Sequence, residues 1–144
     1  MAGPGLSYGL IAALAAAAPA QAGEVVVSVT NVRSNLGHVR VAICRQPFFL
    51  QKTCTIRQAV PSVQGTTTVV FPDVPPGEYA AQGYLDEHDW HEVRRDLLGF
   101  PENGIGFSND APMNFGPPTW DDARFSVGAN GIVRVHMALH YYVL

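Results

Sequence analysis

Two histidines stand among four carboxylates in the segment Asp86-Glu-His-Asp-Trp-His-Glu92. The two imidazoles are three residues apart, so on a helix or in a turn they project to the same side. Imidazole and carboxylate groups suit Zn²⁺ and Cu²⁺. The ligands of such a site would be Asp86, His88, His91 and Glu92. The arginines at positions 94 and 95 instead favour ordinary salt bridges, so a zinc or copper site is the alternative interpretation and the main expectation is no cofactor.

Other residue types with catalytic potential form no recognisable pattern. Ser108 does not lie in a Gly-x-Ser-x-Gly elbow, and no helical pattern begins after it. Asp121 and Asp122 are adjacent, so in an extended strand they project to opposite faces, whereas acid and base catalysis needs convergent carboxyl groups. We therefore expect a protein that is not an enzyme.

A long segment rich in Gly, Pro, Asn and aromatic residues spans positions 86–121. Proline lacks an amide donor and glycine is costly to order, so the segment cannot be regular structure. Its aromatic residues provide apolar area for packing, which predicts an ordered loop, and ordered loops of this length are usually functional.

This loop is the predicted binding surface of an otherwise structural module. The contact residues of the hypothesis are Trp90, Phe100, Asn109 and Trp120. Phe107 and Phe115 have Gly and Pro neighbours and are predicted to pin the loop to the sheet. The expected partner is an envelope protein, a peptide or a glycan.

Alternation of apolar and polar residues with period two predicts strands through most of the chain. The predicted strands are 24–30, 38–44, 66–71, 79–85, 122–127 and 132–143. Turn residues at 34–37 predict an antiparallel hairpin between the first two strands, and Asn130-Gly131 supplies hairpin turn chemistry before the last strand.

Six or seven short strands with turns between them predict an all-β fold, an antiparallel β-sandwich of immunoglobulin-like or transthyretin-like kind with one long ordered loop. A closed barrel is the alternative. The one helical candidate is 89–98, where Trp90, Val93 and Leu97 fall at spacings of three and four.

Residues 1–22 have the pattern of a cleavable signal peptide. The apolar run 10–18 is too short to span a bilayer and leads to Pro19-Ala-Gln-Ala22, a small-x-small cleavage site near Ala22. Residues 23–144 then form a single domain without a transmembrane segment. The predicted location is the periplasm or the extracellular space.

Charge and cysteine content fit that location. Nine basic and twelve acidic side chains give a formal net charge of -3 without a basic stripe, which argues against nucleic acid as a partner. Cys44 and Cys54 are the two cysteines, and in an oxidising compartment they are expected to form a disulfide. Reactive thiols are the alternative.

Several motifs together resemble the exported bacterial family called domain of unknown function 2141. The matching stretches are Gly37 to Ala42, Phe48-Phe-Leu50, Phe71-Pro-Asp-Val-Pro-Pro-Gly-Glu-Tyr79, Asp86-Glu87, Leu98-Gly-Phe-Pro101, Gly104-Ile-Gly-Phe-Ser-Asn109 and Phe115-Gly-Pro-Pro118. The resemblance implies an exported β-sandwich and brings no established activity.

The family pattern after the 79–85 strand is similar to Asp-x-Asn-x-Asn-Gly-x-Leu-Asp, which suits a calcium ion. In this chain only Asp86 keeps its place. Histidine, tryptophan and arginine replace the other oxygen ligands and the glycine, so we do not expect calcium at this position.

Overall fold

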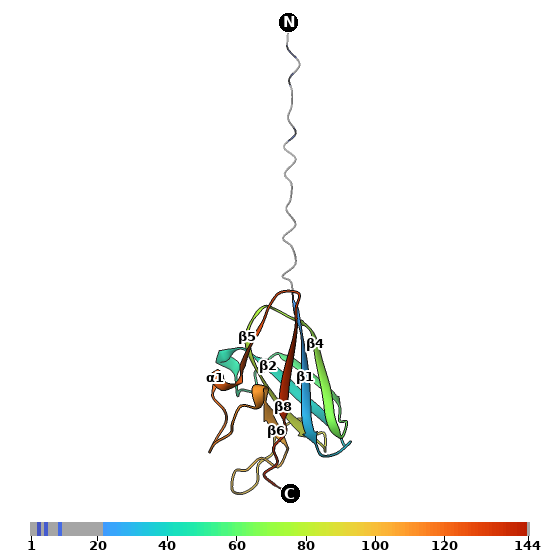
Figure 1. The fold of residues 1–144 in the computed structure, drawn as a ribbon, viewed down its shortest axis with the longest axis vertical. Coiled ribbons are helices and arrows are strands. Elements are labelled where there is room, and N and C mark those ends of the chain that lie inside the picture. Colours follow the sequence, from blue (N-terminus) through green and yellow to red (C-terminus); the bar gives the residue numbers. More distant parts are fainter. Residues whose placement is uncertain (1–2, 4, 6–8, 10–21, 144) are drawn as a thin grey trace.

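The computed structural model describes residues 3, 5, 9 and 22–143. The predicted signal peptide, 1–22, lies almost wholly outside the described residues. The described residues form eight strands (Figure 1): β1 Gly23–Val32, β2 His38–Cys44, β3 Ile56–Pro61, β4 Gly65–Val74, β5 Gly77–Asp86, β6 Ile105–Phe107, β7 Arg124–Val127 and β8 Ile132–Ala138. Three short helical turns join them: η1 Gln46–Phe48, η2 Ser108–Asp110 and α1 Trp120–Ala123.

The strands form two packed sheets. One has three strands in the order β4-β1-β8, in which β1 and β8 are parallel. The other has the order β3-β2-β5-β6, and β7 pairs with the first residues of β5 beyond the short β6. All other pairings are antiparallel. The structure thus confirms the predicted all-β sandwich.

Alternate residues of both sheets form the core, as the period-two pattern predicts. In β1, Val25, Val27 and Val29 are fully buried, and they belong to the same apolar cluster as Val39 and Val41 of β2. A fully buried valine of this kind stabilises the fold by about 1.5–3 kcal/mol relative to an exposed one.

Two predicted hairpins are wrong. β1 and β2 do not pair, because β1 lies between β4 and β8 while β2 lies between β3 and β5. The turn at 34–37 therefore carries the chain from one sheet to the other. The turn around Asn130, whose φ is 58°, does the same between β7 and β8. Turn-forming residues permit a reversal, but they do not choose the neighbouring strand, which the buried faces decide.

The predicted helix at 89–98 is also wrong. Asp89 and His91 have φ values of 53° and 61°, which are incompatible with a right-handed helix. The amides of Trp90 and His91 bind the carboxylate of Asp86 instead of helical carbonyl groups. A four-residue helical turn forms elsewhere, at α1, where the Thr119 side chain accepts from the amide of Asp122.

Cys44 and Cys54 form the expected disulfide, with their Cα atoms 5.3 Å apart. The bond joins the end of β2 to the segment before β3, and both residues are buried. A disulfide fits an extracellular or periplasmic protein. Within the described part of the chain, no helix is long and apolar enough to cross a membrane.

Candidate functional site

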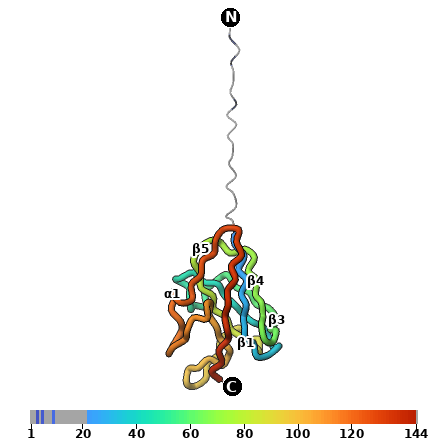
Figure 2. Tube along the Cα trace, in the orientation of Figure 1, coloured from blue at the N-terminus to red at the C-terminus, as the bar shows by residue number. Residues whose placement is uncertain are grey.

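The longest connection in the fold, residues 87–123, leads from β5 to β7 and contains β6, η2 and α1. We divide it into a first half, 87–104, and a second half, 105–123. Figure 2 shows the first half as a loop beside the C-terminus, at the end of the molecule far from the start of β1. This connection contains nearly all of the residues that the sequence singles out for function.

Asp86, the last residue of β5, organises the start of the first half. Its carboxylate is fully buried and accepts hydrogen bonds from the amides of Trp90 and His91 at 2.8 and 2.9 Å. Its third partner is Arg40 of β2, whose Nε lies 2.7 Å from Oδ2. Burial alone would raise the pKa of Asp86, but these hydrogen bonds outweigh burial and lower the pKa below its ordinary value.

Glu87 ties the same region to the turn between β1 and β2. Arg33 donates to Oε1 through Nε at 2.9 Å, and the Ser34 hydroxyl donates to Oε2 at 2.7 Å. Burial would raise the pKa of Glu87, but the bonds from Arg33 and Ser34 lower it. Gly37 lets this turn approach so closely, because its φ is 62° and an added Cβ would overlap the carbonyl oxygen of Asp86.

The four predicted metal ligands do not converge. Both carboxylate oxygens of Asp86 are already bonded, the His88 ring stacks on Trp90, and His91 Nε2 lies 3.4 Å from a nitrogen of Arg40. Glu92 faces Arg94 at 3.4 Å. Among the described residues, no group of three His, Cys, Asp or Glu side chains could hold a metal ion. The carboxylates of Asp86 and Glu92 pair with Arg40 and Arg94, and Asp86 also caps backbone amides.

Trp90 is half-buried between His88 and Arg94. Its ring centroid lies 4.7 Å from that of His88, and the guanidinium carbon of Arg94 lies 4.0 Å from it. The cation over the indole ring holds Arg94 at the base of the next turn. Trp90 therefore supports the loop and leaves only part of its ring to solvent.

Beyond Arg94 the chain forms a narrow excursion with paired sides. The amide of Glu102 donates to the carbonyl of Arg94 at 2.8 Å, and Arg95 forms a β-bridge with Pro101. The buried side chain of Asn103 accepts from the amide of Arg94 at 2.9 Å and donates to the carbonyl of Leu85 at 3.0 Å. These bonds fasten the base of the excursion to β5.

Asp96 fixes the turn at the end of the excursion. One carboxylate oxygen accepts from the amides of Leu98 and Phe100, each at 2.9 Å. The Asp96 carbonyl accepts from the amide of Gly99, whose φ of 88° suits glycine, and Arg95 donates to the Gly99 carbonyl at 3.0 Å. The turn is therefore ordered by its own polar groups.

The same turn exposes apolar side chains. Leu97 is 106% exposed and Leu98 is 82% exposed, relative to a reference extended chain. Phe100 is 48% exposed and stacks on Tyr142, with ring centroids 6.2 Å apart. We call Leu97, Leu98, Phe100 and Tyr142 the apolar tip.

The second half of the connection is held by apolar packing. Phe49, from the disulfide-closed loop, contacts the rings of Phe107 and Trp120 at 6.1 and 5.8 Å. These rings belong to a second buried cluster with both cysteines. The packing agrees with an anchoring role for Phe107, whereas the predicted anchoring role of Phe115 is wrong, because its side chain is 111% exposed.

Polar bonds complete the second half. The side-chain amide of Asn109 donates to the carbonyls of Asp122 and Arg124 at 3.3 and 2.8 Å. The buried hydroxyl of Ser108 accepts from the amide of Ala81 at 2.9 Å. Of the four predicted contact residues, Asn109 and Trp120 thus make structural contacts, Trp90 lies at the base of the tip, and Phe100 belongs to the tip itself.

Sequence reasoning missed Leu97 and Leu98, the most exposed apolar residues of the first half. It assigned Leu97 to the apolar face of a helix that does not form. The available indication was local: Asp96 and Gly99 enclose the two leucines, and both are residues typical of tight turns. A turn in this position leaves the leucines nothing to pack against.

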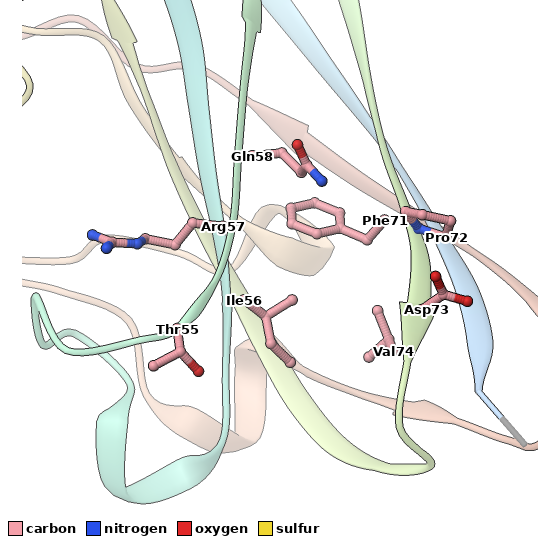
Figure 3. A pocket seen from close by; sticks show the side chains of 8 residues that line it. All are labelled: Thr55, Ile56, Arg57, Gln58, Phe71, Pro72, Asp73 and Val74. Atoms are coloured by element: carbon pink, nitrogen blue, oxygen red, sulfur yellow. The ribbon is translucent and has the colours of Figure 1, made fainter. Parts of the chain in front are cut away.

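Two shallow cavities lie away from this connection. One, of about 250 Å³, opens between β3 and β4 and is shown in Figure 3. The other, of about 300 Å³, adjoins the disulfide and includes Phe48 and Tyr79. Neither is lined by residues of the 87–123 connection.

Comparison with known families agrees with the resemblance seen in the motifs. The model of the family described as "Uncharacterized protein conserved in bacteria (DUF2141)" matches residues 27–135. The chain belongs to this family. The match begins within β1 and ends within β8, so it covers the whole 87–123 connection. The family is uncharacterised, so membership assigns no activity to the chain. No curated protein and no solved structure matched the chain.

Proposed function

We propose that this protein is exported by its N-terminal segment and acts as a non-enzymatic binding module, whose contact surface is the apolar tip. Its partner is a protein or peptide of the cell envelope with an apolar pocket. A glycan fits less well, because the two most exposed side chains of the tip, Leu97 and Leu98, are aliphatic and offer no ring for stacking on a sugar. The rings of Phe100 and Tyr142 already stack on each other.

The proposal depends on one observation: the exposed leucines 97 and 98 lie in a turn that is already ordered. Burying one leucine in a partner would contribute about 1.5–3 kcal/mol to binding. Because Asp96, Gly99 and Arg95 already fix the turn, little conformational entropy is lost when it docks. An apolar turn that needed ordering on binding would lose much of this gain.

The carboxylates at the start of the first half support a structural rather than a catalytic role. A general acid or base works best with a pKa near the operating pH. Asp86 and Glu87 have pKa values below their ordinary ones, and each is held by arginine. Both therefore act as fixed anions that order the loop.

The proposal is tested by capturing partners from envelope extract with purified mature protein. We compare the wild type with the double variant Leu97→Ser/Leu98→Ser and with Ile132→Ser. This control removes an exposed apolar side chain, 61% exposed, at the start of β8 and away from the tip. The expected result is a partner retained by wild type and control and lost by the double variant. Equal capture by all three proteins would refute the tip as the contact surface.

A further inference from the structure

β4 is an edge strand with an unusual composition. It pairs with β1 on one side, and no described strand pairs with its other side. The stretch Gly65-Thr-Thr-Thr-Val-Val-Phe71 within it contains no charged residue and no proline. Natural edge strands are usually protected from pairing by charges, prolines, bulges or covering segments. The protective features of β4, Pro72 and Asp73, come only after this stretch.

The other edges of the sandwich are better protected. On β8, Asp110 accepts from the amide of Ala138 at 2.7 Å and contacts His136 at 2.7 Å, so η2 covers this edge. β3 is a six-residue strand that carries Arg57 and ends at Pro61. β4 therefore presents the longest uncharged edge among the described strands.

We infer that β4 pairs with β4 of a second copy of this chain, antiparallel and centred on Thr68. A two-fold axis perpendicular to the sheet then joins two three-stranded sheets into one of six strands. This inference is independent of the proposed function. None of the residues of the apolar tip belongs to β4.

The register follows from the composition of the strand. In a homotypic pair each side chain meets its own kind or a close neighbour, so a charge near the axis would face a like charge. Centring on Thr68 places Thr68 opposite Thr68 and Thr66 opposite Val70, all of them exposed on the outer face. Threonine opposite threonine and threonine opposite valine are favourable cross-strand pairs. Pro72, which has no amide to donate, stays outside the central stretch.

The cavity between β3 and β4 lies beside the proposed pairing. Figure 3 shows Ile56 and Phe71 facing each other across it, with Val74 beside them and Arg57 and Asp73 towards the outside. The proposed register brings Val63 of the second copy opposite Asp73, next to this cavity. Val63 is 54% exposed in the single chain. The pairing would therefore cover part of the exposed surface of Val63, on the same face of the sheet as Asp73.

The first test is the molar mass of the mature protein by light scattering, at about 100 μM to detect micromolar affinity. The variant Thr68→Lys places two lysines against each other at the axis. Thr53→Lys adds the same charge at an exposed threonine outside β4. We expect a dimer for the wild type and for Thr53→Lys, and a monomer for Thr68→Lys. At a concentration well below the dissociation constant, where dimerisation adds nothing to stability, all three proteins should melt at the same temperature. A monomeric wild type, or a dimer that survives Thr68→Lys, would overturn the inference.

The second test fixes the register. Directly opposed residues have Cα atoms about 4.5–5.5 Å apart, within reach of a disulfide. Thr68→Cys should therefore form a covalent dimer on mild oxidation. In the same register the two copies of residue 66 are about 13 Å apart. Thr66→Cys should not cross-link with itself, and efficient cross-linking of this variant instead of Thr68→Cys would refute the register.

Discussion

Residues 87–104 and residues 105–123 belong to one connection between the same two strands, yet they are held in different ways. The first half is ordered by buried or shielded polar groups, chiefly Asp86, Glu87, Asn103 and Asp96, and it leaves Leu97 and Leu98 in solvent. The second half packs Phe107 and Trp120 against Phe49 and the disulfide, while Phe115 stays exposed.

The difference shows how a loop can be rigid without burying its apolar residues. When side-chain carboxylates and amides satisfy the backbone, the apolar residues of the turn are not needed for order and remain free for binding. When the rings themselves provide the order, they are no longer available to a partner. The two halves therefore differ in which of their residues can act as a contact surface.

The largest expected effect is that of Asp86→Ala. The change leaves Arg40 without its closest carboxylate partner and two backbone amides without acceptors, so we expect a loss of about 3–5 kcal/mol in the free energy of unfolding. Urea unfolding measures it. Asp121→Ala removes an 84% exposed carboxylate and should change stability by less than about 0.5 kcal/mol. Similar small effects for both variants would show that Asp86 does not organise the first half.

Removing the disulfide should act on the second half. Cys44→Ser/Cys54→Ser should lower the free energy of unfolding by roughly 2–3 kcal/mol, because the unfolded chain is no longer constrained. Native-state hydrogen exchange should show faster exchange for the amides of Ala111 and Ala123, near Phe49. The amides of Leu98 and Glu102 should keep their protection. Equal loss of protection in both halves would contradict their independence.

Acid should weaken the first half selectively. The folded-state pKa values of Asp86 and Glu87 lie below the ordinary values of 3.8 and 4.5, so the unfolded chain binds more protons as the pH falls. The stability that these groups contribute is therefore fully present above these ordinary values and is lost as the pH falls through the lower folded values. Urea unfolding between pH 7 and pH 3 measures it, and Glu87→Gln should flatten the curve. If the free energy of unfolding of this variant depended on pH as steeply as that of the wild type, the contacts of Glu87 with Arg33 and Ser34 would be contradicted.

The smallest expected effect on stability is that of Leu97→Ser/Leu98→Ser. Both side chains are in solvent, so the free energy of unfolding should change by no more than about 0.5 kcal/mol, while capture of the partner is lost. Thermal unfolding beside the capture experiment checks both statements. A loss of several kcal/mol would show that the leucines are packed in solution and that the two halves are alike.

The sequence predicted the strands well where one face is buried. Val25, Val27 and Val29 alternate with Val26, Ser28 and Thr30, which face the other way, and the three alternate valines are buried. This pattern could not predict which strands pair, since a turn between sheets and a turn within a hairpin use the same residues. β3 was missed because Arg57, Gln58 and Ala59 are all exposed, so this edge strand lacks the alternation of a half-buried one.

The candidate site was harder to predict, for a specific reason. Trp90, Val93 and Leu97 have helical spacing, but Asp86 captures the amides that a helix would need. This capture depends on Arg40, which stands 46 residues earlier in the chain and keeps the Asp86 carboxylate ionised in the interior. Local sequence contains no information about such a partner. The contact residues predicted at Asn109 and Trp120 were likewise placed by type, without knowledge of the carbonyls and rings that they meet.

The parallel pairing of β1 with β8 has a consequence for how the protein faces its surroundings. Glu24 lies beside Ile132 at the start of β8, whereas Phe100 meets Tyr142 beyond its end. The seven residues of β8 span about 23 Å in between. If the chain were tethered through the residues before Gly23, for example by fusion to a surface, the sandwich would act as a short stalk. Leu97 and Leu98 would then lie at the end of the sandwich away from the surface, where a partner in solution could reach them.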